Sequence, residues 1–282
     1  MFENLKNGWR LGSEIRKLIM KDRVLFSYPI LSALVSMVLA ALIFIPLFVF
    51  APGWSPVTVV VILFVYYLLI SFIGTYLLVA MLISFRAYAK GKPITIGESL
   101  SQTKEYALLI FEWAMFYSII MMLLRALESR GRGITTLIIS AVASFAISMA
   151  ILFVVPVIID QKVGPIKAIE GSVKFIKDNF GATFGGLIFS DLYSMMFILS
   201  GAALFLVGAL LAAAVAALGI VFIVAGLVLM VIGGLLSYMI SNVFRLILYD
   251  YKLTGKLPDG IDTELIKGSI VNKKPGLLSK VL

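Results

Sequence analysis

The chain has 282 residues, of which 61% are hydrophobic and only 14% are charged, and its mean hydropathy is +1.08. A soluble protein of this length carries charge on about a quarter of its residues, so the composition excludes an ordinary soluble domain. The chain has neither Cys nor His, which excludes disulfides and thiolate ligands and removes the commonest metal ligand and general base. We therefore expect a membrane protein that is not an enzyme and that holds no metal or cofactor.

Apolar stretches of about 18 residues or more, long enough to cross a bilayer, follow one another along the chain. The predicted spans are residues 24–50, 57–85, 106–127, 134–159, 183–211 and 220–249. The last two come from one apolar run, which we divide at the Ala- and Gly-rich segment 212–219, although three shorter helices would also fit. The predicted fold class is all-α, a polytopic membrane helical bundle of about six transmembrane helices with cytoplasmic amphipathic helices.

The basic residues collect on one side of this topology. All but three of the 24 Lys and Arg residues lie before the first span, in segments 86–105 and 160–182, or near and after the end of the sixth span. The positive-inside rule places that side in the cytoplasm, and seven spans would break the rule by placing the basic tail outside. We expect a multi-pass protein of the cell membrane with both termini in the cytoplasm. The first apolar run is too long for a signal peptide, so the first span should stay in the mature protein.

An internal repeat joins three basic amphipathic segments to the helices that follow them. Each segment ends in Lys followed by an acidic residue, at Lys21-Asp22, Lys104-Glu105 and Lys177-Asp178, and the last two copies align at a constant offset that pairs Ser99 with Ser172. Any protein that collects charges at helix starts would show similar junctions, and this is the alternative to repetition. We expect one transmembrane domain over residues 1–250, with repeats at about 1–85, 86–159 and 160–250, and a basic cytoplasmic tail over 251–282.

Local signals mark the starts and ends of helices near these segments. Thr95 and Glu98 match a capping box, and Pro93 and Pro165 suit the first turn of a helix. Two spans are followed by similar sequences, which are Gly91-Lys92-Pro93 and Gly255-Lys256-Leu257-Pro258.

The residue pattern of segment 166–180 predicts an amphipathic helix that lies among lipid headgroups. One helical stripe holds Ile166, Ile169, Val173, Ile176 and Phe180, and the lysines lie elsewhere. Such helices place their apolar side in the membrane and their cations against anionic lipid. The candidate headgroup-binding residues in the chain are Arg16, Lys17, Lys21, Lys104, Lys167, Lys174 and Lys177. The expected partners are anionic membrane lipids and not nucleic acid, for which we find no motif.

Three ionisable residues are predicted to lie inside the membrane. Asp191 is 14 residues beyond Lys177, about 21 Å along a helix, and a carboxylate at that depth serves either an ion or proton relay or the packing of helices. Glu112 and Arg245 lie at similar expected depths, so we expect a structural ion pair between them.

On the opposite side of the membrane, four charges interrupt the positive-inside trend. This outer charged cluster comprises Arg125, Glu128, Arg130 and Arg132. It could attract anions, or Arg125 could extend its side chain to the outer interface. The sequence leaves both interpretations open.

Glycines recur at intervals of seven in the last two predicted helices. They are Gly201 and Gly208 in the first, and Gly219, Gly226 and Gly233 in the second. Small residues let membrane helices approach closely. These Gly/Ala faces are expected either to pack the fifth helix against the sixth or to form a homo-oligomer.

Two motifs resemble those of a widespread prokaryotic family of six-span membrane proteins whose function is unknown. One is the run 124–130, LRALESR, and the other is FVVPVI at 153–158 followed by GPIKAI at 164–169 and Ser172. The segment 156–180 is also loosely similar to the membrane domain of some glycerophosphodiester phosphodiesterases, whose catalytic domain this chain lacks. The resemblance implies the fold and topology but no activity.

Two functions remain open at this stage. The first is a transporter or channel for ions, small solutes or lipids, built from repeated hairpins around Asp191. The second is a non-transporting membrane scaffold that binds anionic lipids or a partner protein through its amphipathic helices.

Overall fold

The computed structural model describes residues 13–50, 53–130, 134–178 and 180–258, with side chains for all of these except 50, 127–130, 134–137 and 180–191. Within these ranges the regular structure is helical and no strand occurs, which confirms the all-α fold class. Six helices in the same ranges are long and apolar enough to cross a membrane. The number of predicted spans is therefore confirmed.

The helices follow the predicted spans closely. In chain order they are η1 (Arg23–Phe26), α2 (Ser27–Phe50), α3 (Pro56–Ala89), α4 (Ile96–Thr103), η3 (Lys104–Tyr106), α5 (Ala107–Arg130), α6 (Ile134–Ala150), α7 (Val154–Gln161), α8 (Pro165–Asp178), α9 (Phe180–Ala212) and α10 (Ala216–Thr254). Residues 13–21 are also helical. The long apolar run that follows α8 is divided between Ala212 and Ala216, so the division predicted at 212–219 is confirmed and three shorter helices are excluded.

Two compact units make up the chain. Unit 1 comprises Met1–Phe26 and Asn179–Leu282, and unit 2 comprises Ser27–Asp178. Unit 1 thus holds helix 13–21, η1, α9 and α10, whereas unit 2 holds α2 to α8.

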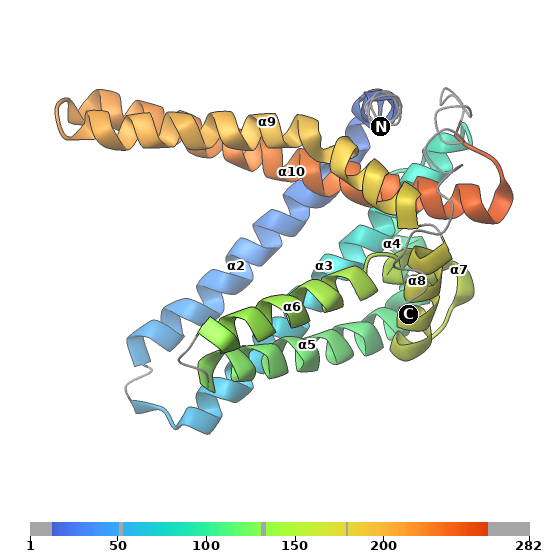
Figure 1. The fold of residues 1–282 in the computed structure, drawn as a ribbon, viewed down its shortest axis with the longest axis horizontal. Coiled ribbons are helices and arrows are strands. Elements are labelled where there is room, and N and C mark those ends of the chain that lie inside the picture. The colour runs from blue at the N-terminus through green and yellow to red at the C-terminus, as the bar shows by residue number, and fades with distance from the viewer. Residues whose placement is uncertain (1–12, 51–52, 131–133, 179, 259–282) are drawn as a thin grey trace. The chain divides into compact units, whose positions relative to one another are not determined.

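In unit 1, α9 and α10 form an antiparallel hairpin (Figure 1) whose glycines lie in the interface between the two helices. A Cβ on Gly226 would be 2.6 Å from the carbonyl oxygen of Gly201, and one on Gly208 would be 2.6 Å from the backbone nitrogen of Ile223. These separations are shorter than van der Waals contact, so only glycine permits this approach. The predicted packing of the fifth helix on the sixth is therefore present, and a homo-oligomer through these faces stays a prediction.

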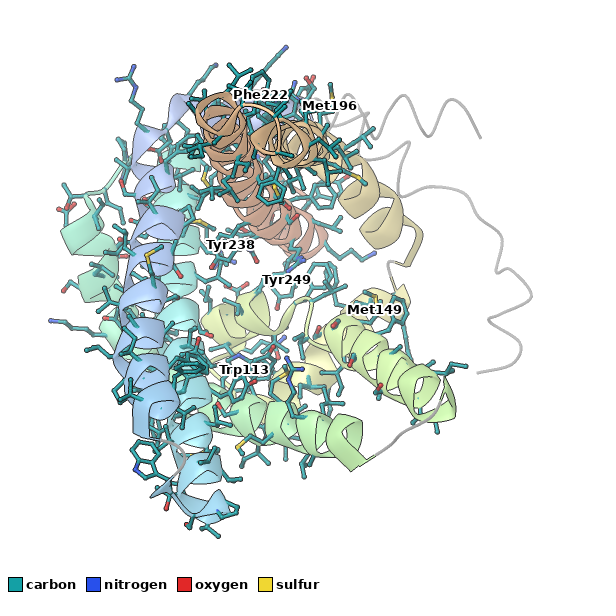
Figure 2. The ribbon with its side chains drawn as sticks, turned by 90° about the vertical axis from the view of Figure 1, so that its left-hand side faces the viewer. Trp113, Met149, Met196, Phe222, Tyr238 and Tyr249 are labelled. Atoms are coloured by element: carbon teal, nitrogen blue, oxygen red, sulfur yellow. The ribbon has the colours of Figure 1, made fainter. Side chains whose placement is uncertain are left out.

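In unit 2, α3 packs against α2, α4 and α5. Aromatic rings join these helices: Phe44 of α2 meets Tyr66 of α3 with ring centroids 4.9 Å apart, and Phe72 of α3 meets Phe111 of α5 at 6.3 Å. Trp113 of α5, labelled in Figure 2, is buried. Apolar residues on the outer surfaces stay exposed, as expected for helices that face lipid.

The helix starts and ends follow the local signals with one exception. Thr95 and Glu98 form the predicted capping box at the start of α4, and Pro165 is the first residue of α8. Pro93 instead precedes the cap residue Thr95, so its predicted place in the first turn is wrong. Gly91 and Gly255 both have φ near +70°, where a residue with a Cβ is strained, and the two similar exit sequences therefore share one backbone geometry.

The fourth predicted span is not one continuous helix. It breaks at residues 151–153, between α6 and α7. Pro156 has no N–H and cannot donate to the carbonyl of Leu152, so the α-helical ladder is interrupted there. The hydroxyl of Ser172 on α8 accepts a hydrogen bond from the Phe153 N–H at 3.0 Å, and Ser172 is fully buried. A polar group of the break thus finds its partner on the amphipathic helix.

Ser99, the residue that the repeat pairs with Ser172, is buried to the same extent. The Ser99 hydroxyl lies 2.5 Å from the Tyr28 hydroxyl of α2. Both serines therefore attach a short helix to the bundle, Ser99 through a side chain of α2 and Ser172 through the backbone between α6 and α7. The sequence alignment paired these positions without indicating what either of them does.

Replacing Gly226 by Ala should destabilise the α9–α10 hairpin. The added Cβ would be 2.6 Å from the Gly201 carbonyl oxygen and the Phe205 nitrogen, and overpacking of this kind costs about 1–3 kcal/mol. Thermal unfolding in detergent should show a lower midpoint for Gly226→Ala than for the natural protein. Gly234→Ala on the same helix is the control, because its Cβ would meet nothing within 4 Å. Equal midpoints for the two variants would show that the close approach is absent.

Candidate functional site

Arg86 and Asp160 connect the ends of α3 and α7 within unit 2. Two nitrogens of the Arg86 guanidinium donate to the two Asp160 oxygens, at 2.7 and 2.9 Å. The side chains are 20% and 26% exposed, so the pair is shielded from most of the solvent. Paired hydrogen bonds between Arg and a carboxylate also fix the orientation of both groups. This clamp holds the C-terminal end of α7 in place just before the chain turns into α8.

A second, weaker ion pair lies near the turn between α7 and α8. Lys162 adopts a left-handed backbone conformation with φ of 49°, and its ammonium nitrogen lies 3.5 Å from a Glu105 oxygen. The same nitrogen lies 5.4 Å from the centroid of the Tyr106 ring. Both charged side chains are mostly exposed, so the pair contributes little to stability. It nevertheless neutralises Glu105, one of the acidic residues at a repeat junction.

Helix α8 presents three successive sectors around its axis. The first, which is buried, comprises Ala168, Ser172 and Phe175. Phe175 lies against Phe153, with ring centroids 4.4 Å apart, and a Cβ on Gly171 would be 3.1 Å from Val157 of α7. This sector therefore fixes α8 to α7 and to the break in the fourth span.

The second sector of α8 is apolar and lies directly beside the first. At 3.6 residues per turn, Ile169, Val173 and Ile166 follow Ile176 around the helix. Ile176 is buried, Ile169 and Val173 are half-buried, and Ile166 is 64% exposed. The predicted stripe is thus a continuous apolar face, but only its edge at Ile176 belongs to the packed side. Phe180 lies beyond the residues whose side chains are described.

The third sector of α8 is polar and exposed. It holds Lys167, Lys174 and Lys177, with Glu170 and Asp178 among them. Within the described part of the chain, none of the three lysines has an acidic group within ion-pair distance. Lys104, just after α4, is exposed as well. The arrangement places exposed lysine side chains next to an apolar surface.

The candidate cations near the N-terminus belong to unit 1. Helix 13–21 buries Ile15 and Ile19 completely and exposes Lys17 and Lys21. Arg16 is half-buried, and its guanidinium carbon lies 4.0 Å from the centroid of the Tyr193 ring on α9. This helix thus has the same division into a buried side and a cationic side.

The residues predicted to lie inside the membrane are not brought together by the described contacts. Glu112 is exposed on α5, and a Cβ on Gly164 would be 3.3 Å from one of its oxygens. Arg245 is half-buried on α10 and donates to the Asn242 side chain at 3.4 Å. Because Glu112 lies in unit 2 and Arg245 in unit 1, their ion pair stays a prediction. Asp191 lies on α9, and its side chain is outside the described set.

The outer charged cluster is described only in part. Arg125 is exposed near the end of α5. Glu128 and Arg130 belong to the same helix, but their side chains are not among those described, and Arg132 lies outside the described residues. Both interpretations of this cluster therefore remain open.

Asp22 is a polar residue whose role the sequence did not indicate. It directly precedes η1, and its carboxylate accepts a hydrogen bond from the Val24 N–H at 3.0 Å. The residue is only 8% exposed. Burial raises the pKa of Asp22 above its ordinary value of 3.8, and the hydrogen bond from Val24 opposes this effect in part. The Lys-acidic junction had marked this position only as part of the repeat.

Comparisons with known proteins give a family but no activity. The sequence model of DUF6159, a family of unknown function, matches residues 55–258. This range contains α3 to α10. No curated protein and no solved structure matches the chain. The chemistry must therefore be inferred from the residues described above.

The Arg86–Asp160 clamp should show a measurable coupling free energy. Replacing Arg86, Asp160 or both by Ala in a double-mutant cycle should give about 1–2 kcal/mol of coupling, because the pair is bidentate and shielded. Glu105 and Lys162 provide a matched control cycle, with coupling below about 0.5 kcal/mol expected for an exposed pair. The free energies come from denaturation in mixed micelles. Equal coupling in the two cycles would contradict the structural role of the clamp.

Asp22 should make stability fall as the pH rises. Its pKa is higher in the folded protein than in the unfolded chain, so the folded state binds the proton more tightly. Its contribution to stability is therefore fully present below the unfolded pKa and is lost as the pH rises through the folded pKa. Asp22→Asn keeps the acceptor for Val24 and removes the titration. We compare the unfolding midpoints of the variant and the natural protein. The midpoint of the variant should rise relative to that of the natural protein between about pH 4 and pH 7, and a constant difference would contradict this account.

Proposed function

Because the chain belongs to DUF6159, a family of unknown function, we propose its function from its own surface. It is an integral membrane protein that crosses the bilayer six times and binds anionic lipid headgroups through α8, as a scaffold and not as an enzyme. In this proposal both termini lie in the cytoplasm, because the basic segments share one side of the membrane. The cell membrane is the expected location.

The single observation that carries the proposal is the three-sector surface of α8. Ala168, Ser172 and Phe175 fix the helix to its neighbours in unit 2, while the exposed Ile166 and the exposed lysines remain on its outer surface. A helix that is attached to a membrane bundle and has an apolar sector beside a cationic one is suited to the interface. Its apolar side chains enter the acyl boundary, and its cations meet lipid phosphates.

The internal ion pairs support the same proposal. Asp160 is held by Arg86, and Glu105 is near Lys162, so two acidic groups of this region already have cationic partners. Glu170 and Asp178 share the polar sector of α8 and reduce its attraction for anions. Each near-surface cation contributes about 1 kcal/mol of attraction to an anionic leaflet, which makes the lysines the groups to test.

Transport around Asp191 is the other function that the sequence allowed. It rests on the sequence alone, because the side chain of Asp191 lies outside the described residues. Flux of ions or small solutes in proteoliposomes would support it directly. The binding proposal needs no such flux, so the two functions can be distinguished by experiment.

Neutralising the lysines of α8 should remove selectivity for anionic lipid. The triple variant Lys167→Gln, Lys174→Gln and Lys177→Gln is compared with the natural protein in vesicles that contain spin-labelled phosphatidylglycerol or phosphatidylcholine. We expect the preference of the protein-bound lipid for phosphatidylglycerol to fall, by at most about fivefold for each lysine. The motionally restricted fraction of each labelled lipid measures this preference.

A matched triple variant controls for total charge. Lys90→Gln, Lys92→Gln and Lys256→Gln remove three other exposed lysines and should leave most of the preference in place. Equal losses in the two triple variants would show a general effect of basic residues and not a site on α8. An unchanged preference in the α8 variant would exclude the proposed site.

A further inference from the structure

The contact between Arg16 and Tyr193 gives information on where α9 leaves the membrane. The guanidinium carbon of Arg16 lies 4.0 Å from the centroid of the Tyr193 ring, and both residues belong to unit 1. The helix that carries Arg16 also exposes Lys17 and Lys21. Lys and Arg are costly at the centre of a bilayer, and this helix carries three of them, so it lies outside the hydrocarbon. Tyr193 is therefore close to the headgroup level.

The lengths of the two hairpin helices agree with this level. α9 has 33 residues and α10 has 39, or about 50 and 58 Å at 1.5 Å per residue. The hydrocarbon core is only about 30 Å thick, so both helices continue beyond it. About 20 helical residues span 30 Å. Counting about 20 residues back from Ala212, the last residue of α9, leads to Tyr193.

The exposed apolar surface of α10 ends at nearly the same level. Large apolar side chains are exposed at many positions from Leu218 to Ile232, and the next described one on this helix is Leu253. Gly233 faces Phe197 and Ile198 of α9 across the hairpin, so Ile232 lies within about two turns of the level of Tyr193. Tyr238, labelled in Figure 2, follows on α10. Tyrosines are enriched at membrane interfaces.

We propose that the hydrocarbon core ends at Tyr193 on α9 and near Tyr238 on α10, so that Arg16 and Tyr193 form a surface that binds anionic lipid headgroups. The occupant is a lipid phosphate, because the exposed cations Lys17 and Lys21 accompany Arg16 on the same helix. This surface lies in unit 1 and does not depend on the lysines of α8.

This boundary changes the expected position of two charged residues. Asp191 precedes Tyr193, and Arg245 follows Tyr238 by seven residues, so both lie outside the hydrocarbon. The depth of about 21 Å obtained by counting from Lys177 assumed that α9 enters the membrane at its first residue. The contact with Arg16 removes that assumption, and with it the cost of a carboxylate deep in lipid.

Depth measurements on single-Cys variants test the boundary, since the natural chain has no Cys. Leu192→Cys, Leu199→Cys and Leu206→Cys replace side chains that are 40%, 58% and 63% exposed. Each variant is spin-labelled in vesicles of phosphatidylglycerol and phosphatidylcholine. Collisions with oxygen, which partitions into hydrocarbon, are compared with collisions with a water-soluble nickel chelate.

The proposal predicts a label at position 192 that collides mainly with the nickel chelate. Positions 199 and 206 should be oxygen-favoured and nearly equal in depth, with position 199 about 10 Å beyond the boundary. Oxygen-favoured collisions at position 192 equal to those at 199 would overturn the proposal. Where Leu192→Cys does not fold, Met196→Cys replaces it with an expected depth of about 5 Å, and a depth equal to that of position 199 would again overturn it.

The lipid phosphate is tested separately in the same vesicles. Arg16→Gln should reduce the preference for spin-labelled phosphatidylglycerol even when the lysines of α8 are already neutralised. An unchanged preference in that background would overturn the headgroup-binding part of the proposal. A loss there, together with an unchanged preference in the α8 triple variant alone, would place lipid binding at Arg16 and not at α8.

Discussion

The hydrogen bond from the Phe153 N–H to the Ser172 hydroxyl is the interaction on which the candidate site depends. A buried backbone N–H without a partner costs about 1–3 kcal/mol, and Pro156 removes one hydrogen bond from the α-helical ladder next to this break. Ser172 supplies the partner from α8 at 3.0 Å. Together with the packing of Phe175 on Phe153, the same bond fixes the rotation of α8 about its axis. Which side chains of α8 stay exposed therefore follows in part from how one backbone group is satisfied.

Around that bond, the ionic contacts divide the charges of unit 2 into two sets. Arg86 and Lys162 are used within the protein, by Asp160 and Glu105. The lysines on α8 have no such partners among the described residues. The clamp at Asp160 immediately precedes the turn into α8. The charges that are paired within the protein and the exposed lysines therefore lie on adjacent segments. In the proposed function, this division leaves the lysines of α8 for anionic lipid.

Much of the fold follows from hydropathy, and the site follows only in part. Long apolar runs predicted the six helices, and small residues at 212–219 predicted the division between α9 and α10. The stripe from Ile166 to Ile176 had the right period, but its packed neighbours Ala168 and Ser172 are small or polar and give no hydropathy signal. Arg86 and Asp160 are 74 residues apart, so no local pattern could pair them. The depth that counting from Lys177 predicts for Asp191 depends on where α9 enters the bilayer, and hydropathy alone does not mark that point.

The most direct test of this account is lipid selectivity in Ser172→Ala, which leaves every charge unchanged. Loss of the partner of Phe153 should release α8, and the preference for spin-labelled phosphatidylglycerol should fall toward that of the α8 lysine variant. Ser101→Ala, on the exposed side of α4, controls for removal of a serine hydroxyl and should retain the preference. A preference in Ser172→Ala equal to that of the natural protein would contradict the account, because lipid binding would then not depend on how α8 is held.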